Sequence, residues 1–166
     1  MDLLGMEGGR QEHPVDLIEQ IASRHSWAFE RDDQDEISIA ITGSWCDYHV
    51  SFTWLDDVEA LHLACAFDLK VPERRKAEIA QLIGRVNAQL WVGHFDLWSS
   101  ENAVMFRHSL LLSGGTPPMP DQCEALIKVA VEACEKYFQA FQFVVWAGKS
   151  ASEALETILF ETAGEA

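Results

Sequence analysis

The sequence lacks the motifs by which many activities are first identified. It has no Cys-x-x-Cys pair, no Gly-x-Ser-x-Gly, no P-loop and no Gly-x-Gly-x-x-Gly, so the signatures of zinc sites, α/β hydrolases and nucleotide-binding enzymes are absent. No apolar run approaches the ~18 residues of a membrane span. Residues 1–13 have neither the basic region nor the apolar run of a secretory signal. We therefore expect a cytoplasmic, non-enzymatic protein with no cofactor and no metal.

Basic residues are also scarce. Twelve Lys and Arg stand against 27 Asp and Glu, which gives a net charge of −15. This excess repels phosphate backbones and anionic lipid, which disfavours nucleic-acid and membrane partners, and we expect neither. The hydrophobic fraction of 48% over 166 residues is typical of one globular domain. We expect a flexible N-terminal segment over residues 1–12 and a single domain over 13–166.

Potential metal ligands and nucleophiles are dispersed. The expected strand register separates Cys46 from Cys65 by about 13 Å, too far for a disulfide. All four cysteines (Cys46, Cys65, Cys123 and Cys134) are therefore predicted to be reduced core thiols. His94 and His108 fall on opposite faces of one hairpin, and His108 is expected to be a hydrogen-bonded core histidine. These positions predict no metal site and no nucleophile–base pair.

Hydrophobic periodicity predicts the elements. Helices are expected over 14–25, from 72 to about 90, over 121–146 and over 150–162. Strands are expected over 37–43, 46–54, 61–69, 95–99 and 103–112, and the acidic run 31–36 is expected to be a turn. The predicted fold class is α+β, an antiparallel β-sheet packed on one face by helices in the order α-β-β-β-α-β-β-α-α.

The hairpin between 46–54 and 61–69 has a predictable register. If Leu55 opposes Ala60, Trp54 meets Leu61 and Phe52 meets Leu63. Both apolar stripes then share one face, as a stable register requires. The opposite face is polar or small and suits solvent.

The helix over 121–146 has an apolar arc that spans about 200°, wider than the stripe one core requires. Two stripes lie side by side, one of Leu126, Val129, Ala130, Ala133 and Tyr137, the other of Ile127, Val131, Cys134 and Phe138. Either the last helix folds back over the second stripe, or that stripe is a subunit or partner interface. Both readings stay open at this point.

Several apolar residues are candidates for binding a partner. Aromatic and thioether side chains are enriched at interfaces, and Trp98 and Met105 fall on the outward side of their hairpin. The candidate surface comprises Trp91, Trp98, Met105, Leu111, Ile127, Val131 and Phe138. An alternative is a small-ligand pocket on the polar sheet face near His94, Asp96 and Arg107.

Five segments resemble the YbjN family of bacterial proteins, which are described as sensory transduction regulators. They are Trp45-Cys46-Asp47-Tyr48 and residues 66–72 (AFDLKVP), 90–98 (LWVGHFDLW), 106–108 (FRH) and 141–146 (FQFVVW), and the resemblance covers residues 13–162. It implies a fold similar to type III secretion chaperones, which are small, acidic and dimeric and bind unfolded segments of client proteins. The family offers no catalytic or ligand residues to carry over.

Together these observations favour a non-enzymatic regulator or chaperone-like homodimer that binds a polypeptide partner. The alternative is a small-ligand sensor or an unrecognised enzyme that uses the polar sheet face.

Overall fold

The computed structural model describes residues 12–164, with side chains to residue 160. Four α-helices and six strands follow the chain in the order α1 (Pro14–Arg24), β1 (Ala28–Asp33), β2 (Glu36–Thr42), β3 (Asp47–Leu55), β4 (Ala60–Lys70), α2 (Lys76–Asn87), β5 (His94–Trp98), β6 (Ala103–Leu111), α3 (Pro120–Val145) and α4 (Ala151–Gly164). The predicted α+β class is confirmed. The expected flexible segment over residues 1–12 lies, apart from residue 12, outside the described residues, and the single domain over 13–166 stays a prediction.

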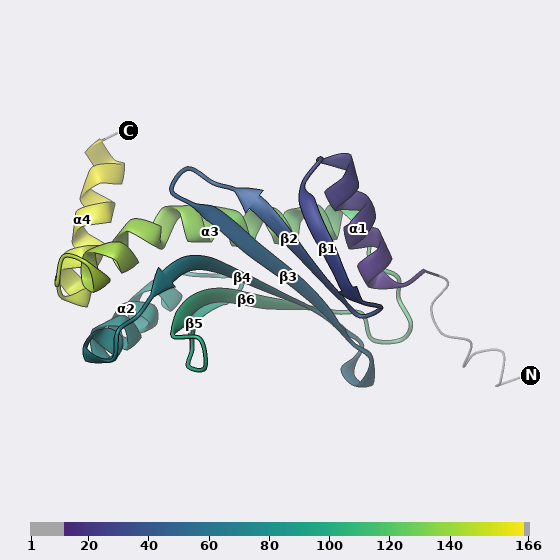
Figure 1. The fold of residues 1–166 in the computed structure, drawn as a ribbon, viewed down its shortest axis with the longest axis horizontal. Helices are drawn as coiled ribbons and strands as arrows, with labels where there is room; N and C mark the ends of the chain where they lie inside the picture. The colour runs from purple at the N-terminus through teal and green to yellow at the C-terminus, as the bar shows by residue number, and fades with distance from the viewer. Residues whose placement is uncertain (1–11, 165–166) are drawn as a thin grey trace, which may run out of the picture.

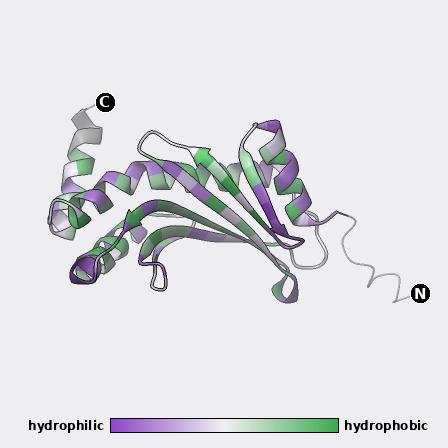
Figure 2. Ribbon diagram, in the orientation of Figure 1, coloured by the Kyte–Doolittle hydropathy of each residue, from purple (hydrophilic) through white to green (hydrophobic). Residues whose placement is uncertain are grey.

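The strands form one antiparallel sheet in the order β1-β2-β3-β4-β6-β5. Figure 1 shows α3 lying along the sheet, with α1 near the N-terminal end of the molecule and α2 and α4 at the other end. Hydrophobic and hydrophilic residues are interspersed along these elements (Figure 2). On β2 and β3 every second side chain is buried, so one sheet face forms the core and the other, here called the outer face, meets solvent.

The register predicted for β3 and β4 is confirmed. Leu55 pairs with Ala60, and Trp54 pairs with Leu61. The core-facing residues of both strands are buried. Alternation alone was sufficient here because a slip of one residue would move both apolar stripes to the solvent face.

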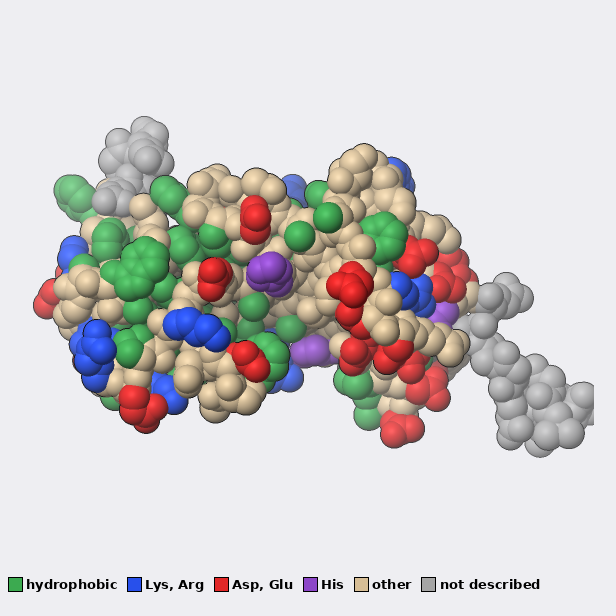
Figure 3. Space-filling model, in the orientation of Figure 1, with side chains coloured by type: hydrophobic (Ala, Val, Ile, Leu, Met, Phe, Trp, Pro, Cys, Tyr) green, Lys and Arg blue, Asp and Glu red, His purple; other side chains and the backbone are tan. Residues whose placement is uncertain are grey.

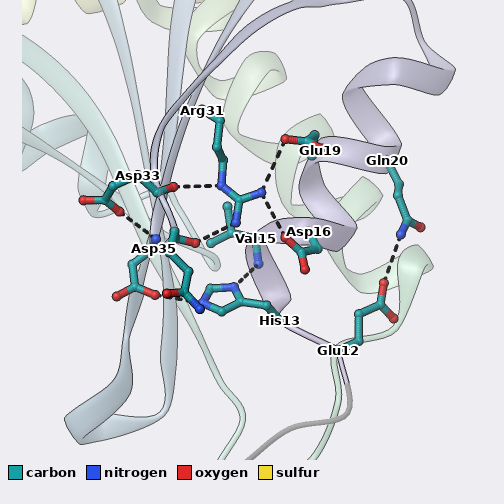
Figure 4. Close-up of polar contacts among 10 residues, drawn as sticks. Glu12, His13, Val15, Asp16, Glu19, Gln20, Arg31, Asp33 and Asp35 are labelled. Atoms are coloured by element: carbon teal, nitrogen blue, oxygen red, sulfur yellow. Dashed lines mark hydrogen bonds and ion pairs between the residues drawn. The ribbon is translucent and has the colours of Figure 1, made fainter.

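The acidic run 31–36, expected to be a turn, contains the second half of a strand, β1, and this additional strand corrects the predicted element order. Phe29 pairs with Ile39 and Arg31 pairs with Ile37. Arg31 makes the strand possible, since its Nη1 lies 2.9 Å from Asp16 Oδ1 on α1 and its Nε donates to the backbone carbonyl of Asp33 at 2.8 Å. Figure 4 shows this guanidinium between the carboxylates of α1 and the β1–β2 turn. A charge-assisted network therefore replaces the apolar pattern that sequence reasoning looks for.

His13 closes the same region from the start of α1. Its Nδ1 accepts a hydrogen bond from the backbone N–H of Val15, and its Nε2 lies 2.8 Å from Asp35 Oδ1 (Figure 4). The first attaches the imidazole to the first turn of α1, and the second attaches it to the β1–β2 turn. Helix α1 is thereby held beside the edge strand β1.

Candidate protein-binding surface

Most residues of both apolar stripes of α3 are buried within this chain, and Val129 and Val131 are half-buried. Tyr137 of the first stripe packs edge-on against Phe95 of β5, with ring centroids 6.0 Å apart. Phe138 of the second stripe packs against Phe67 of β4 at 5.2 Å. The apolar arc of α3 is wide because strands of the sheet contact this helix along two of its sides.

The two readings of the second stripe can now be compared with the structure. Ile127 and Phe138 are each only 3% exposed, so in this arrangement neither is available to a partner. Helix α4 does not fold back over the stripe, because it turns away at the C-terminal end of α3 (Figure 1) and packs there against α2 and α3. The sheet itself covers the stripe.

Val131 remains partly exposed in an apolar hollow of about 310 Å³ between α3, the end of α1 and the sheet. The ring of Trp27 stacks on His25 at 4.2 Å and forms one wall, and Ile41 of β2 forms another. His25 Nε2 lies 2.9 Å from Glu124 Oε1, which ties α1 to α3 at the rim. We call this hollow the Val131 groove. It lies beside the start of β1, an edge strand of the sheet.

A second hollow of about 300 Å³ lies on the other side of α3, lined in part by Val92, Val129 and Tyr137. Trp91 projects beside it and is fully exposed, at 101% of its reference area. We call this hollow the Trp91 groove. Both grooves include Glu132 of α3, so together they flank one helix and form a continuous region, which we call the α3 surface.

The other candidate residues lie elsewhere. Trp98 pairs with Ala103 and Met105 pairs with Asp96, and both side chains lie on the outer face of the sheet. Leu111 pairs with Ala60 near the opposite end of β6 and is 69% exposed. The structure therefore brings Trp91 and Val131 together around α3 but separates them from Trp98, Met105 and Leu111.

The alternative polar site does assemble on the outer face. Arg107 of β6 pairs with His94 of β5, and its Nη1 donates to Asp96 Oδ2 at 3.3 Å. On the other side its Nε donates to His62 Nε2 at 3.4 Å. The polar sheet face predicted from the sequence includes His62, but its contact with Arg107 depends on the pairing of β4 with β6, which are not consecutive strands.

A hollow of about 600 Å³ lies beside these residues, and His62, His94, Arg107 and His108 line it. We call it the Arg107 hollow. Burial, followed by the nearby Arg107, lowers the pKa of His62, and burial also lowers the pKa of His108. His108 borders this hollow and is half-buried, but it pairs with the fully buried Leu63, so its side chain lies on the core side of β6, as expected from the sequence. Figure 3 shows histidine side chains near the middle of the face in view, while acidic side chains gather toward the N-terminal end.

The cysteines are free thiols, three of them buried. The thiols of Cys65 on β4 and Cys134 on α3 lie 3.6 Å apart, a contact that no spacing in the sequence indicates. Burial raises the pKa of Cys123 to about 11. Within residues 12–164, no three metal-ligating side chains come together, and none of the helices in that range is both long and apolar enough to span a bilayer.

Known structures share this architecture. A chain in the crystal structure of the ExsC–ExsE complex is 17% identical with a TM-score of 0.51, covering 82% of this chain and 94% of that one. The crystal structure of YbjN from E. coli, described as a putative transcription regulator, is 11% identical with a TM-score of 0.53, covering 73% of this chain and 85% of that one. The expected likeness to the type III secretion chaperone fold is thus confirmed. No functionally curated protein matches the chain. A family model described as "Putative bacterial sensory transduction regulator" matches residues 14–143, and the chain therefore belongs to the YbjN family.

Proposed function

We propose that this protein is a non-enzymatic, cytoplasmic regulator that binds a segment of a polypeptide partner across the α3 surface and acts as a homodimer. The observation that carries the proposal is the fully exposed Trp91 beside an apolar groove on the helical side of the molecule. A tryptophan buries about 200 Å² in a contact, or about 5 kcal/mol of gross transfer free energy. Left in water, that area contributes nothing to folding, which favours a role in binding.

The two grooves suit an extended chain better than a compact small molecule. Each is shallow and apolar along part of its wall, and they lie on opposite sides of one helix. A segment crossing α3 would place one apolar side chain near Val131 and another near Trp91. The net charge of −15 favours a basic partner through electrostatic steering. The likeness to ExsC, which is crystallised in complex with ExsE, supports a polypeptide partner.

The proposal is tested by capture of the partner from cytosol of the source cells with variants on each face. Trp91→Ser and Val131→Asp are both expected to weaken capture. Loss of one central aromatic contact typically costs about 2 kcal/mol, or roughly thirtyfold in affinity. Trp98→Ser, on the outer face, serves as the matched aromatic control and should leave capture unchanged.

The opposite pattern would move the site. If Trp98→Ser abolishes capture and Trp91→Ser does not, the partner binds the outer face and the assignment of the α3 surface as the binding site is wrong.

Light scattering on the purified protein tests the dimer, which would have twice the chain mass of 18.7 kDa. A mass of one chain at micromolar concentration would contradict the homodimer.

A further inference from the structure

We propose that the Arg107 hollow binds the phosphate group of a small phosphorylated molecule. This inference is independent of the polypeptide-binding proposal because the hollow lies on the outer face, across the sheet from α3. Its volume of about 600 Å³ is within the range of small-molecule sites.

Charge distinguishes this hollow from the other surfaces described. The chain has more than twice as many acids as bases, and both grooves of the α3 surface include a carboxylate. Among the described residues that line the Arg107 hollow, none is acidic, whereas one arginine and three histidines are present. Asp96 contacts Arg107 from β5 but is not part of the lining. Basic groups in a cluster repel one another when they are protonated, and a bound anion reduces that repulsion.

The contacts hold the guanidinium in place. Because Arg107 Nε always carries a proton, His62 Nε2 must accept it, and the proton of neutral His62 lies on Nδ1. That nitrogen lies 2.8 Å from Ser109 Oγ, to which it donates. Asp96 fixes the guanidinium from the other side. Arginine has further N–H donors beyond these two contacts, and its planar group suits phosphate oxygens.

Phosphate fits the remaining groups better than a carboxylate does. His94 can supply an imidazole donor, and the hydroxyls of Thr53 and Ser109 also line the hollow, so more donors converge than a carboxylate can use. A phosphate monoester offers three acceptor oxygens, and its second pKa near 6 lies close to that of histidine. Leu55 at the rim provides an apolar wall for the organic part of the molecule.

The test is a titration of the full chain followed by NMR of the imidazole C–H resonances, at fixed pH. The probes are inorganic phosphate and glucose 6-phosphate, with sodium chloride at matched ionic strength as the blank. We expect saturable shifts of the resonances of His62 and His94, whose side chains lie on the outer face. The resonances of His13, His25 and His49 should remain still, because these residues lie outside the hollow. Tighter binding of the sugar phosphate would identify an organic phosphate as the ligand, and equal binding would identify free phosphate.

Variants make the result specific. Arg107→Gln should weaken phosphate binding at least tenfold, whereas Arg74→Gln, which removes an exposed arginine of the β4–α2 connection, should not. If Arg107→Gln fails to fold, His94→Gln on the exposed edge strand replaces it and should weaken binding severalfold. The proposal is overturned if no histidine shifts in millimolar phosphate, if all six shift together, or if the variant at the hollow binds as well as the original chain.

Discussion

Gly93 connects the fold to the α3 surface, and its replacement by alanine is a sharp test of the packing described above. Its φ of +74° is in the left-handed region, where an L residue is strained by about 1–2 kcal/mol. An added Cβ would also overlap the ring of Phe106, with Cε1 and Cε2 only 2.7 and 2.8 Å away. Phe106 is fully buried and packs edge-on against Phe95 at 5.5 Å, so the ring cannot move without disturbing the core.

The chain offers a matched control at Gly115. Its φ is +73°, and an added Cβ there would meet no atom within 4 Å. Gly115→Ala therefore bears the conformational cost alone. Gly93→Ala bears the same cost plus overpacking of a buried ring, which typically adds about 1–3 kcal/mol. Effects of alanine on the unfolded chain are shared by both variants and cancel in the comparison.

Urea unfolding followed by far-UV circular dichroism measures the difference. We expect Gly93→Ala to lose about 1–3 kcal/mol more than Gly115→Ala, or about 2–12 °C in melting temperature for a chain of this length. In a Phe106→Leu background the extra loss should shrink, since the clashing ring is gone. Equal losses for the two glycine variants would refute the reasoning, because they would mean that the ring yields freely and does not fix the segment that carries Trp91.

Further outcomes follow from other contacts. Arg75 donates to the carbonyls of Val144 and Lys149 at 2.8 and 2.7 Å, so Arg75→Ala should cost about 2 kcal/mol and speed amide exchange in α4; unchanged exchange would refute this. Burial and the nearby Arg107, His94 and His108 lower the pKa of His62 below its ordinary 6.5 in the folded chain. The unfolded chain therefore binds more protons, and the free energy of unfolding falls as the pH drops below 6.5. His62→Gln should reduce this dependence of stability on pH, and an unchanged dependence would contradict the assignment. At pH 8 the buried Cys123, with a pKa of about 11, should react with Ellman's reagent only after unfolding, while half-buried Cys46 reacts first.

Local pattern was enough to predict much of this fold. Alternation along β3 and β4 predicted a register that the structure confirms pair by pair, since each apolar residue has one face on which it can be buried. Edge strand β1 escaped because its inward positions include Arg31 and its remaining residues are mostly charged. The strand is stabilised by ion pairs between Arg31 and carboxylates of α1. These contacts join distant segments, so the pattern within one segment cannot predict them.

Local sequence pattern predicts even less of the candidate sites, because their residues come from distant segments. His62 meets Arg107 and Ser109 only because β4 pairs with β6, and α2 and β5 separate those strands in the sequence. Cys65 meets Cys134 only because α3 lies across the sheet. Trp91 was a candidate for partner binding from the sequence, and its side chain is fully exposed. The wide apolar arc of α3 is present, but it is buried within the chain: Ile127 and Phe138 are each 3% exposed, and Phe138 packs against Phe67 of β4.

The segment from Trp91 to Phe95 links the two proposed sites. Trp91 borders the α3 surface, Gly93 is held against the Phe106 ring, and His94 lines the Arg107 hollow. Phe106 itself precedes Arg107 on β6, with its side chain on the other face of the sheet. An anion that fixes His94 should therefore restrict Trp91, and by linkage a partner that fixes Trp91 should tighten anion binding. Iodide quenching measures this without a partner: the contribution of Trp91, taken as the difference between the original chain and Trp91→Phe, should change on adding phosphate, and should no longer do so in Arg107→Gln. If phosphate binds but the contribution of Trp91 is the same with and without it, the segment does not couple the two faces.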